Sequence, residues 1–320
     1  MSTYYEIFGG KINVISGNPS NPIKGQVWFD TATPALKYAS LSPASWSSGG
    51  NMGTARYMLG GCGTQTAGLG FAGYVNTYVG SVLNEEYDGS AWTGGGNMGT
   101  ARVLIGSAGT QTAGLGFGGY STPSNKNNTE EYNGSTWTGG GNLSLARNRI
   151  GGAGTQTAGL AISGFQATSP GTTGTEEYNG SSWSGGGTLP QGRASTGGAG
   201  TQTAALAAGG GEGVPSSNAL KYDGSTWTTG GNLISGNRGR LRAAGTQTAA
   251  VVFGDNVTTE EYDGTSFSLT SSMNTGRSHL GGAGVQNAAL AFGGRTTVLT
   301  AVTEEYSPPG AIITRTVTTS

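Results

Sequence analysis

The sequence has very little of the residue types that most catalytic and metal-binding sites use. Its 320 residues include one cysteine, Cys62, and one histidine, His279. A single cysteine can form no intramolecular disulfide and no thiolate metal cluster. Any Ser-His-Asp or Cys-His arrangement would depend on His279, which stands beside Arg277 at the expected start of a strand. We therefore expect no catalytic residues, no metal site and no cofactor, and we interpret the chain as a binding or structural protein.

Charged residues and long apolar runs are also scarce. Charged side chains make up 10% of the sequence and the net charge is −1, so it has no basic footprint for nucleic acid or anionic lipid. The first twenty residues lack the basic start and apolar run of a signal peptide, and no apolar run of about 18 residues follows. We expect a chain made and folded in the cytoplasm, with no membrane insertion and no nucleic-acid partner.

Glycine, by contrast, is abundant, with 63 of the 320 residues. This is about a fifth of the chain, against a usual share of roughly 7%, and such a composition often indicates disorder. Here the glycines recur at fixed positions beside tryptophan, tyrosine, leucine and phenylalanine. A solvated coil would have no reason to keep this spacing, so the sequence predicts a folded repeat protein.

Two markers recur with the same period along the chain. An aromatic residue stands at Trp46, Trp92, Trp137, Trp183, Trp227 and Phe267. The glutamine of a Gly-Thr-Gln-Thr-Ala unit, or of its last variant Gly-Val-Gln-Asn-Ala, stands at Gln65, Gln111, Gln156, Gln202, Gln247 and Gln286. A shared period of about 45 residues, with several short strands in each unit, is typical of propeller blades. The pattern therefore predicts six tandem units and an all-β fold.

Each unit divides into four expected strands. In the second unit the first strand starts near the repeated arginine, in Ala101–Gly106, and the second is Ala113–Phe117, with glycines on one face and larger side chains on the other. The third is Thr129–Tyr132, and the fourth contains Trp137. Between these two, Asn133-Gly134 predicts a tight type I′ hairpin turn, which needs a positive φ at both central residues.

The ends of the chain depart from the repeat. The sixth unit has no hairpin after Tyr306, so its outer strand must come from another part of the chain. We predict that the stretch around Trp46 completes it, while the tail Ile312–Val317 stays open as the rival. Near the start, Gln26–Asp30 and Ala35–Tyr38 predict a β-hairpin. We expect three parts: an N-terminal arm and hairpin at 1–40, a propeller at 41–310, and a C-terminal strand or tail at 311–320.

The repeat resembles a known family. The order of an arginine, an apolar strand, a strand ending in Gly-Gly, a Glu-x-Tyr-Asp motif and a tryptophan resembles the kelch repeat, over roughly residues 45–306. The resemblance implies a six-bladed kelch-like β-propeller, here with a short N-terminal β-hairpin arm. Kelch-like oxidases of the galactose oxidase kind bind copper through histidines and a cysteine-linked tyrosine. With only His279 and Cys62 available, that chemistry is excluded.

A narrower resemblance concerns the near-identical units together with the preceding segment Gly17–Trp28. They are similar to kelch-like virion and tail-fibre proteins of tailed bacteriophages, notably those that infect cyanobacteria. The resemblance implies a virion component, made in the host cytoplasm and often located at the tail or its fibres. It would attach to other virion proteins through residues 1–40 and meet a glycan or protein of the host surface. Two alternatives remain: a purely structural connector or decoration protein, and a carbohydrate-binding module.

The loops between the second and third strands vary from unit to unit, whereas the turns at the opposite face repeat almost unchanged. They comprise residues 74–84, 120–128, 165–174, 211–218, 255–258 and 295–302. Variation on a regular scaffold is where recognition usually lies, although loops also vary where nothing constrains them. The candidate ligand-binding residues in these loops are Tyr74, Tyr78, Tyr120, Asn125, Lys126, Phe165 and Arg295.

Three further motifs have structural interpretations. Adjacent glutamates such as Glu130 and Glu131 point to opposite faces of a strand, so they cannot act on one substrate; we expect one to pair with the repeated arginine and the other to face water. The repeated arginines, at 56, 102, 147, 193, 238 and 277, are expected to pair within the scaffold rather than hold an anion in a channel. The G-x-G-x-x-G run at Gly114–Gly119 lies in a strand with no helix after it, so its glycines serve packing.

Overall fold

The structure is a computed structural model that describes residues 3–7, 10–75, 80–169, 171–211, 216–310 and 312–317. Within these ranges the chain is all β-strand, turn and loop. The described residues contain no helix that is long and apolar enough to cross a membrane. The chain divides into two compact units, one of Met1–Ser45 with Ser307–Ser320 and one of Trp46–Tyr306.

The smaller unit is a five-stranded sheet in the order β1-β2-β3-β4-β31. Its strands are β1 (Thr3–Ile7), β2 (Gly10–Ile15), β3 (Val27–Asp30), β4 (Ala35–Leu41) and β31 (Ile312–Thr316). The predicted hairpin is confirmed, since β3 and β4 pair antiparallel with Asp30 opposite Ala35. The tail strand β31 pairs with β4, so it belongs to this sheet and not to the repeats.

A buried carboxylate holds the hairpin turn of the smaller unit. Asp30 is 1% exposed and accepts hydrogen bonds from the backbone N–H groups of Gly17 and Ala32, at 2.7 and 2.9 Å. The hydroxyl of Thr33 and the Nζ of Lys37 also donate to it, each at 2.6 Å. The hydrogen bond from Lys37, followed by that from Thr33, holds the pKa of Asp30 well below its usual range.

In the larger unit the described residues of the repeats form six four-stranded antiparallel sheets, numbered here 1 to 6 in chain order. Sheet 1 consists of β6 (Gly60–Gly63), β7 (Gly68–Phe71), β8 (Asn84–Tyr87) and β9 (Trp92–Gly94). Sheet 2 consists of β10 (Gly106–Gly109), β11 (Gly114–Phe117), β14 (Thr129–Tyr132) and β15 (Trp137–Gly140). Sheet 3 consists of β16 (Gly151–Gly154), β17 (Gly159–Ile162), β18 (Thr175–Tyr178) and β19 (Trp183–Gly185). Sheet 4 consists of β20 (Gly197–Gly200), β21 (Ala205–Ala208), β22 (Asn218–Tyr222) and β23 (Trp227–Asn232). Sheet 5 consists of β24 (Arg242–Gly245), β25 (Ala250–Gly254), β26 (Asn256–Tyr262) and β27 (Phe267–Leu269). Sheet 6 consists of β28 (Gly281–Val285), β29 (Ala288–Phe292), β30 (Thr303–Ser307) and β5 (Ser45–Ser48).

The outer strand of sheet 6 comes from the beginning of the larger unit. Strand β5, which carries Trp46, lies next to β30 in the sheet order β28-β29-β30-β5. The stretch around Trp46 therefore supplies the strand that the sixth repeat lacks, as predicted, and the tail does not.

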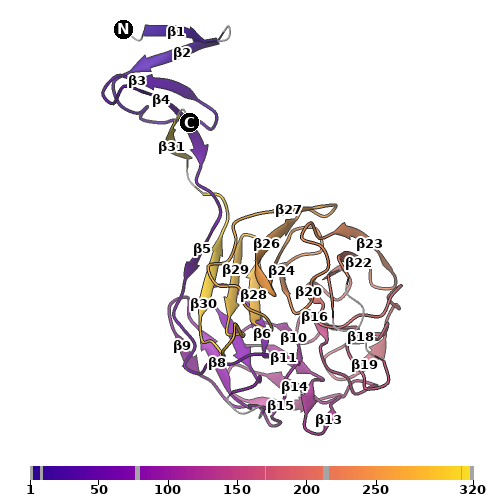
Figure 1. Ribbon diagram of the computed structural model, residues 1–320. Helices are drawn as coiled ribbons and strands as arrows, with labels where there is room; N and C mark the ends of the chain where they lie inside the picture. Colours follow the sequence, from indigo (N-terminus) through magenta and orange to yellow (C-terminus); the bar gives the residue numbers. More distant parts are fainter. Residues whose placement is uncertain are drawn as a thin grey trace. The chain divides into compact units, whose positions relative to one another are not determined.

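The sheets are arranged like the blades of a propeller, which agrees with the predicted all-β architecture. Figure 1 shows the first strand of each sheet near a common centre and the last strand towards the rim. The first strands contact one another in the order β6, β10, β16, β20, β24 and β28, and β28 also contacts β6. The larger unit thus has a propeller-like fold.

Two details of the predicted repeat were wrong. The first strand of sheet 2 begins at Gly106 rather than near Ala101, because Leu104 has a φ of 55° and interrupts the extended backbone. The hairpin turn is not type I′: Gly134 has a φ of 90°, but Asn133 has no positive φ. Instead, Asn133 Oδ1 accepts from the N–H groups of Ser135 and Thr136 at 3.0 and 2.9 Å, which closes a four-residue loop.

Side chains of one sheet pack against the glycine face of the next, as the alternation predicted. A Cβ atom placed on Gly114 would lie 2.6 Å from Leu69 Cδ2 of sheet 1. Leu69 and Phe71 are fully buried and belong to one cluster with Met98 and Ile105 of the second repeat. The interior of this unit therefore consists of layers between sheets, and the glycines make the close approach possible.

The repeated polar residues join strands and sheets. Arg102 donates to the carbonyls of Gly118 and Asn128, at 2.8 and 2.6 Å, and to Glu130 at 2.7 Å. The expected pairing of arginine with one glutamate is thus confirmed for this repeat. The same ion pair occurs as Arg56–Glu85, Arg147–Glu176, Arg238–Glu260 and Arg277–Glu304.

The expectation that the second glutamate faces water was wrong. Its carboxylate accepts a hydrogen bond from the tyrosine hydroxyl of the following sheet, because the strand turns that side chain towards the neighbouring sheet. The pairs are Tyr87–Glu305, Tyr132–Glu86, Tyr178–Glu131, Tyr222–Glu177 and Tyr306–Glu261. These glutamates therefore tie neighbouring sheets together.

Candidate functional site

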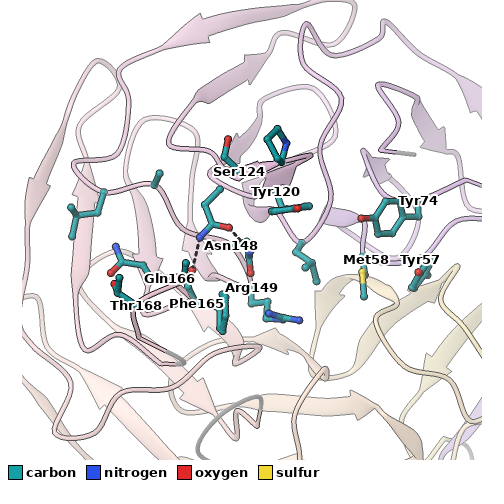
Figure 2. Close-up of a pocket in the computed structure, with 16 residues that line it drawn as sticks. Tyr57, Met58, Tyr74, Tyr120, Ser124, Asn148, Arg149, Phe165, Gln166 and Thr168 are labelled. Atoms are coloured by element: carbon teal, nitrogen blue, oxygen red, sulfur yellow. Dashed lines mark hydrogen bonds between the residues drawn. The ribbon is translucent and has the colours of Figure 1, made fainter. Parts of the chain in front are cut away.

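A cavity of about 880 Å³ opens on the face that carries the variable loops, at sheets 1 to 3 (Figure 2). Its aromatic wall consists of Tyr57, Tyr74, Tyr120 and Phe165. Polar groups come from Ser124, Asn125, Asn148, Gln166 and Thr168. Figure 2 shows Tyr57, Met58 and Tyr74 on one side of the cavity, and Phe165, Gln166 and Thr168 on the other.

Short backbone bridges place these side chains. In the repeats around the cavity the residue after the repeated arginine pairs antiparallel with the first residue of the variable loop, as in Tyr57 with Tyr74 and Asn148 with Phe165. Val103 and Tyr120 form the corresponding bridge in the second repeat. Each bridge sets one residue from the link between sheets beside one residue from a loop. Two chemically variable positions thus meet on the same face in each of these repeats.

The aromatic side chains present flat faces at the cavity. The rings of Tyr57 and Tyr74 lie 5.4 Å apart between centroids, tilted by 35°. The guanidinium carbon of Arg149 lies 4.8 Å from the centroid of Phe165, within the range of a cation–π contact. This contact fixes the positively charged group of Arg149 beside an aromatic wall.

An amide chain links two of the loops beneath the cavity. Asn148 Nδ2 donates to Asn125 Oδ1 at 2.7 Å, and Asn125 Nδ2 donates to the carbonyl of Phe165 at 3.3 Å, as dashed lines mark in Figure 2. Asn148 is 4% exposed, and its Oδ1 has no hydrogen-bond partner in the part of the chain that the structure describes. A buried polar atom without a partner is costly in a folded protein. Asn148, a residue of the cavity lining, thus carries a buried acceptor whose hydrogen bond is not made within the described residues.

A ring of residues with left-handed backbone, joined by hydrogen bonds, lies at the inner end of the cavity. The second residue after each repeated arginine has a φ between 54° and 58°: Met58, Leu104, Arg149, Ser195, Arg240 and His279. Residues other than glycine rarely adopt this left-handed backbone conformation, and here backbone hydrogen bonds between neighbouring repeats hold it. The N–H of Leu104 donates to Met58, that of Arg149 to Leu104, and that of Met58 to His279, each at 2.8 Å.

The ring surrounds a small pocket of about 20 Å³, called here the axial pocket. Its wall includes Arg149, Arg240, Arg242 and His279. Burial and then the positive charges of Arg240, Arg242, Arg149 and Arg295 lower the pKa of His279 to about 3. His279 is therefore neutral at physiological pH, and the arginines set the charge at this end of the site.

The structure brings four of the candidate residues together. Tyr74, Tyr120, Asn125 and Phe165 all line the cavity. Lys126 does not line it; its Nζ lies 3.2 Å from Ser124 Oγ, and its N–H donates to Gly119.

Two candidates remain. Arg295 also lies outside the cavity lining, with its guanidinium 5.6 Å from the centroid of Tyr57. Tyr78 lies outside the described residues.

Sequence reasoning missed the half of the cavity that comes from the links between sheets. Met58, Leu104, Asn148 and Arg149 were not candidates, although they line it. A signal was present, because the two positions after the repeated arginine change in each unit while the surrounding residues hardly vary. They were missed because they lie in the links between sheets and not in the variable loops between second and third strands.

The lining residues include no aspartate, glutamate, cysteine or histidine among those described. Nor do the described ranges hold a group of three or more His, Cys, Asp or Glu residues placed to ligate a metal ion. The arrangement supplies stacking faces, amide groups and one guanidinium. These are the groups of a binding site for a polar ligand with flat apolar faces.

No family model matches the chain, and no curated protein matches it.

Proposed function

We propose that the larger unit is a closed six-bladed kelch-like β-propeller. Contacts between β28 and β6 support closure, as does the side chain of Gln65, which donates to the carbonyls of Ala289 and Tyr306 at 3.0 and 2.7 Å. The equivalent glutamine of each later repeat makes the same two bonds to the sheet before it. The junction between sheets 6 and 1 thus uses the contacts of the other five.

We further propose that the protein is a non-enzymatic virion component of a tailed bacteriophage, at the tail or its fibres, that binds a glycan of the host surface. The observation that carries the binding role is the cavity with its aromatic walls and its amide groups. Aromatic rings stack on the apolar faces of sugars, and amide groups bond to hydroxyls. The resemblance of the repeats to phage virion proteins supports the setting.

The smaller unit supplies the proposed attachment to other virion proteins. It is a compact unit of its own, and it unites the two ends of the chain in one sheet. In this proposal the smaller unit anchors the protein and the larger unit recognises the host surface.

The test is the binding of purified full-length protein to host cells and to an array of host-surface glycans. We expect binding by the native protein and its loss in Tyr120→Ala and Phe165→Ala. Val298→Ala is the matched control, because Val298 is 67% exposed in the loop of sheet 6 and lies outside the cavity lining. Circular dichroism would confirm that each variant is folded.

A failure of the native protein to bind cells and glycans would contradict the recognition role. The structural alternative, a connector or decoration protein, would then account for the fold. A cryo-electron microscopy map of the particle separates the two roles directly: recognition requires the cavity to face solvent, and a connector requires it to be covered by neighbouring virion proteins.

A further inference from the structure

The large cavity and the axial pocket share part of their walls. Met58, Leu104 and Arg149 line both. A ligand that reaches the inner end of the cavity therefore meets the residues that surround the axis. The charge at the axis acts on any group bound there, since the same three residues form the wall between the two spaces.

That charge is entirely positive among the described lining residues. The axial pocket is lined by Arg149, Arg240 and Arg242, and the part of its wall described here includes no aspartate or glutamate. The large cavity has Arg149 as the one charged residue in its described lining. This pattern is unexpected in a chain with a net charge of −1. The repeated arginines, by contrast, are engaged inside the sheets, as Arg102 is by Glu130.

Arg242 departs from the repeat in a way that adds to this charge. The equivalent residue is a glycine in the other five sheets: Gly60, Gly106, Gly151, Gly197 and Gly281. The Arg242 side chain extends to the first repeat, where its Nη2 donates to the carbonyl of Leu59 at 3.0 Å. Its buried Nε has no hydrogen-bond partner among the described residues. Burial lowers the pKa of Arg242 to about 10, so the guanidinium keeps its charge at neutral pH.

The axial pocket itself is too small for a sugar or an oxyanion. Its volume is about 20 Å³, and the adjoining space lined by Ser107, Thr196 and Arg242 measures about 40 Å³. Among the described residues around the axis, the space large enough for an anionic group is on the cavity side of the ring, next to Arg149. The aromatic walls begin at the same place, because the Arg149 guanidinium lies over Phe165.

We propose that the cavity binds an acidic saccharide, with its carboxylate or sulfate at the inner end against Arg149 and its ring outward between Tyr120 and Phe165. This inference rests on the proposed glycan-binding function and specifies its ligand class. Arg149 donates charge-assisted hydrogen bonds to the anionic group. Arg240 and Arg242 favour the same negative charge from behind the ring, through a region of low dielectric.

The experiment compares three probes, glucuronate, glucose 6-sulfate and glucose, by ligand-observed NMR titration of the full-length protein at low ionic strength. We expect both acidic sugars to bind more tightly than glucose, by on the order of ten-fold. Arg149→Gln is expected to remove this preference, and Arg149→Lys to keep most of it, because lysine retains the charge. Lys24→Gln, which removes an exposed charge of the smaller unit, is the control and should change nothing.

Each outcome decides one point. Equal binding of glucose and glucuronate, or an unchanged preference in Arg149→Gln, would overturn the inference about acidic ligands. If Tyr120→Ala then still weakened all three sugars, glycan recognition by the cavity would stand without it. Lack of binding by both acidic sugars would also overturn the inference, while host-cell binding would continue to test the proposed function separately. A preference that declines as salt is added supports a charge at the site.

Discussion

The indole Nε1 of Trp227 donates to Thr175 Oγ1 at 3.0 Å, which joins sheet 4 to sheet 3. The same bond occurs as Trp46–Thr259, Trp92–Thr303 and Trp183–Thr129. In sheet 5 the tryptophan position holds Phe267, and the threonine position of the preceding sheet holds Ala219, within one buried cluster. Five junctions thus have either both hydrogen-bonding partners or neither. At the junction of sheets 1 and 2 the equivalent residues are Asn84 and Trp137, and Trp137 Nε1 has no hydrogen-bond partner among the described residues.

This relationship predicts the outcome of a double-mutant cycle. Trp227→Phe and Thr175→Ala should each lower the free energy of unfolding by about 1–3 kcal/mol, because each leaves a buried partner without its hydrogen bond. The double variant should be more stable than the sum of the two effects indicates, by about 1 kcal/mol, since it reproduces the natural pair of Phe267 and Ala219. Urea denaturation measures all four proteins. Strict additivity would show that the bond contributes nothing.

The hydroxyl of Tyr262 marks a junction that can be improved. It is buried and has no hydrogen-bond partner among the described residues, because sheet 4 has Lys221 where the other sheets have the accepting glutamate. Lys221→Glu should restore a bond like that of Tyr222 to Glu177, at 2.6 Å, and stabilise the protein by about 1 kcal/mol. Thermal unfolding should show a midpoint about 2 °C higher. Lys126→Glu makes the same charge change in the loop and should give no gain.

The buried ion pairs predict that two repeated arginines differ in how much they contribute to the free energy of unfolding. Arg102→Leu leaves Glu130 buried and two carbonyls without their donor, so we expect a loss of about 3–5 kcal/mol. Arg193→Leu should cost less, because sheet 4 has Leu220 in place of that glutamate and only carbonyls lose a donor. Denaturant midpoints of the two variants test the difference. Equal losses would mean that the carboxylate adds nothing to the cost.

The tyrosines that join the sheets predict a loss of stability in alkali. Burial and the hydrogen bond to a glutamate raise the pKa of Tyr132 and Tyr178 to about 12, against about 10 in the unfolded chain. The unfolded state therefore releases these protons first. Their contribution is complete below about pH 10 and is lost as the pH rises through 12. Unfolding midpoints between pH 8 and 12, with absorbance of tyrosinate in parallel, test this; ionisation of all tyrosines near pH 10 in the folded protein would contradict it.

The single histidine permits a direct measurement at the axis. Burial, followed by the charges of Arg240, Arg242 and other arginines, lowers the pKa of His279 to about 3. Unfolded His279 takes up a proton near pH 6.5, so its contribution to stability is present above that pH and declines as the pH falls towards 3. The ring proton resonance should stay that of neutral imidazole at pH 5. A midpoint near 6.5 would show that the side chain is not held among these arginines.

Much of the architecture could be predicted from the sequence because each unit repeats the same local residue patterns. The period of about 45 residues, the glycine alternation of Gly114–Phe117 and the lost hairpin after Tyr306 all depend on local patterns. They predicted four-stranded sheets, packing of large side chains on glycine faces, and the use of β5 in sheet 6, and the structure agrees. The variable loops likewise pointed to the face on which the cavity lies.

Tertiary structure alone decided which side chains meet. The second glutamate of each pair looked solvated in sequence, but its acceptor role needs a tyrosine about 45 residues away. The left-handed backbone at Arg149 depends on a bond from a neighbouring repeat, which no local pattern reveals. Asn148 and Arg149 line the cavity only because the links between sheets are brought beside the loops. Local pattern therefore determined the strands and their packing faces, whereas the charge and shape of the site come from contacts between repeats.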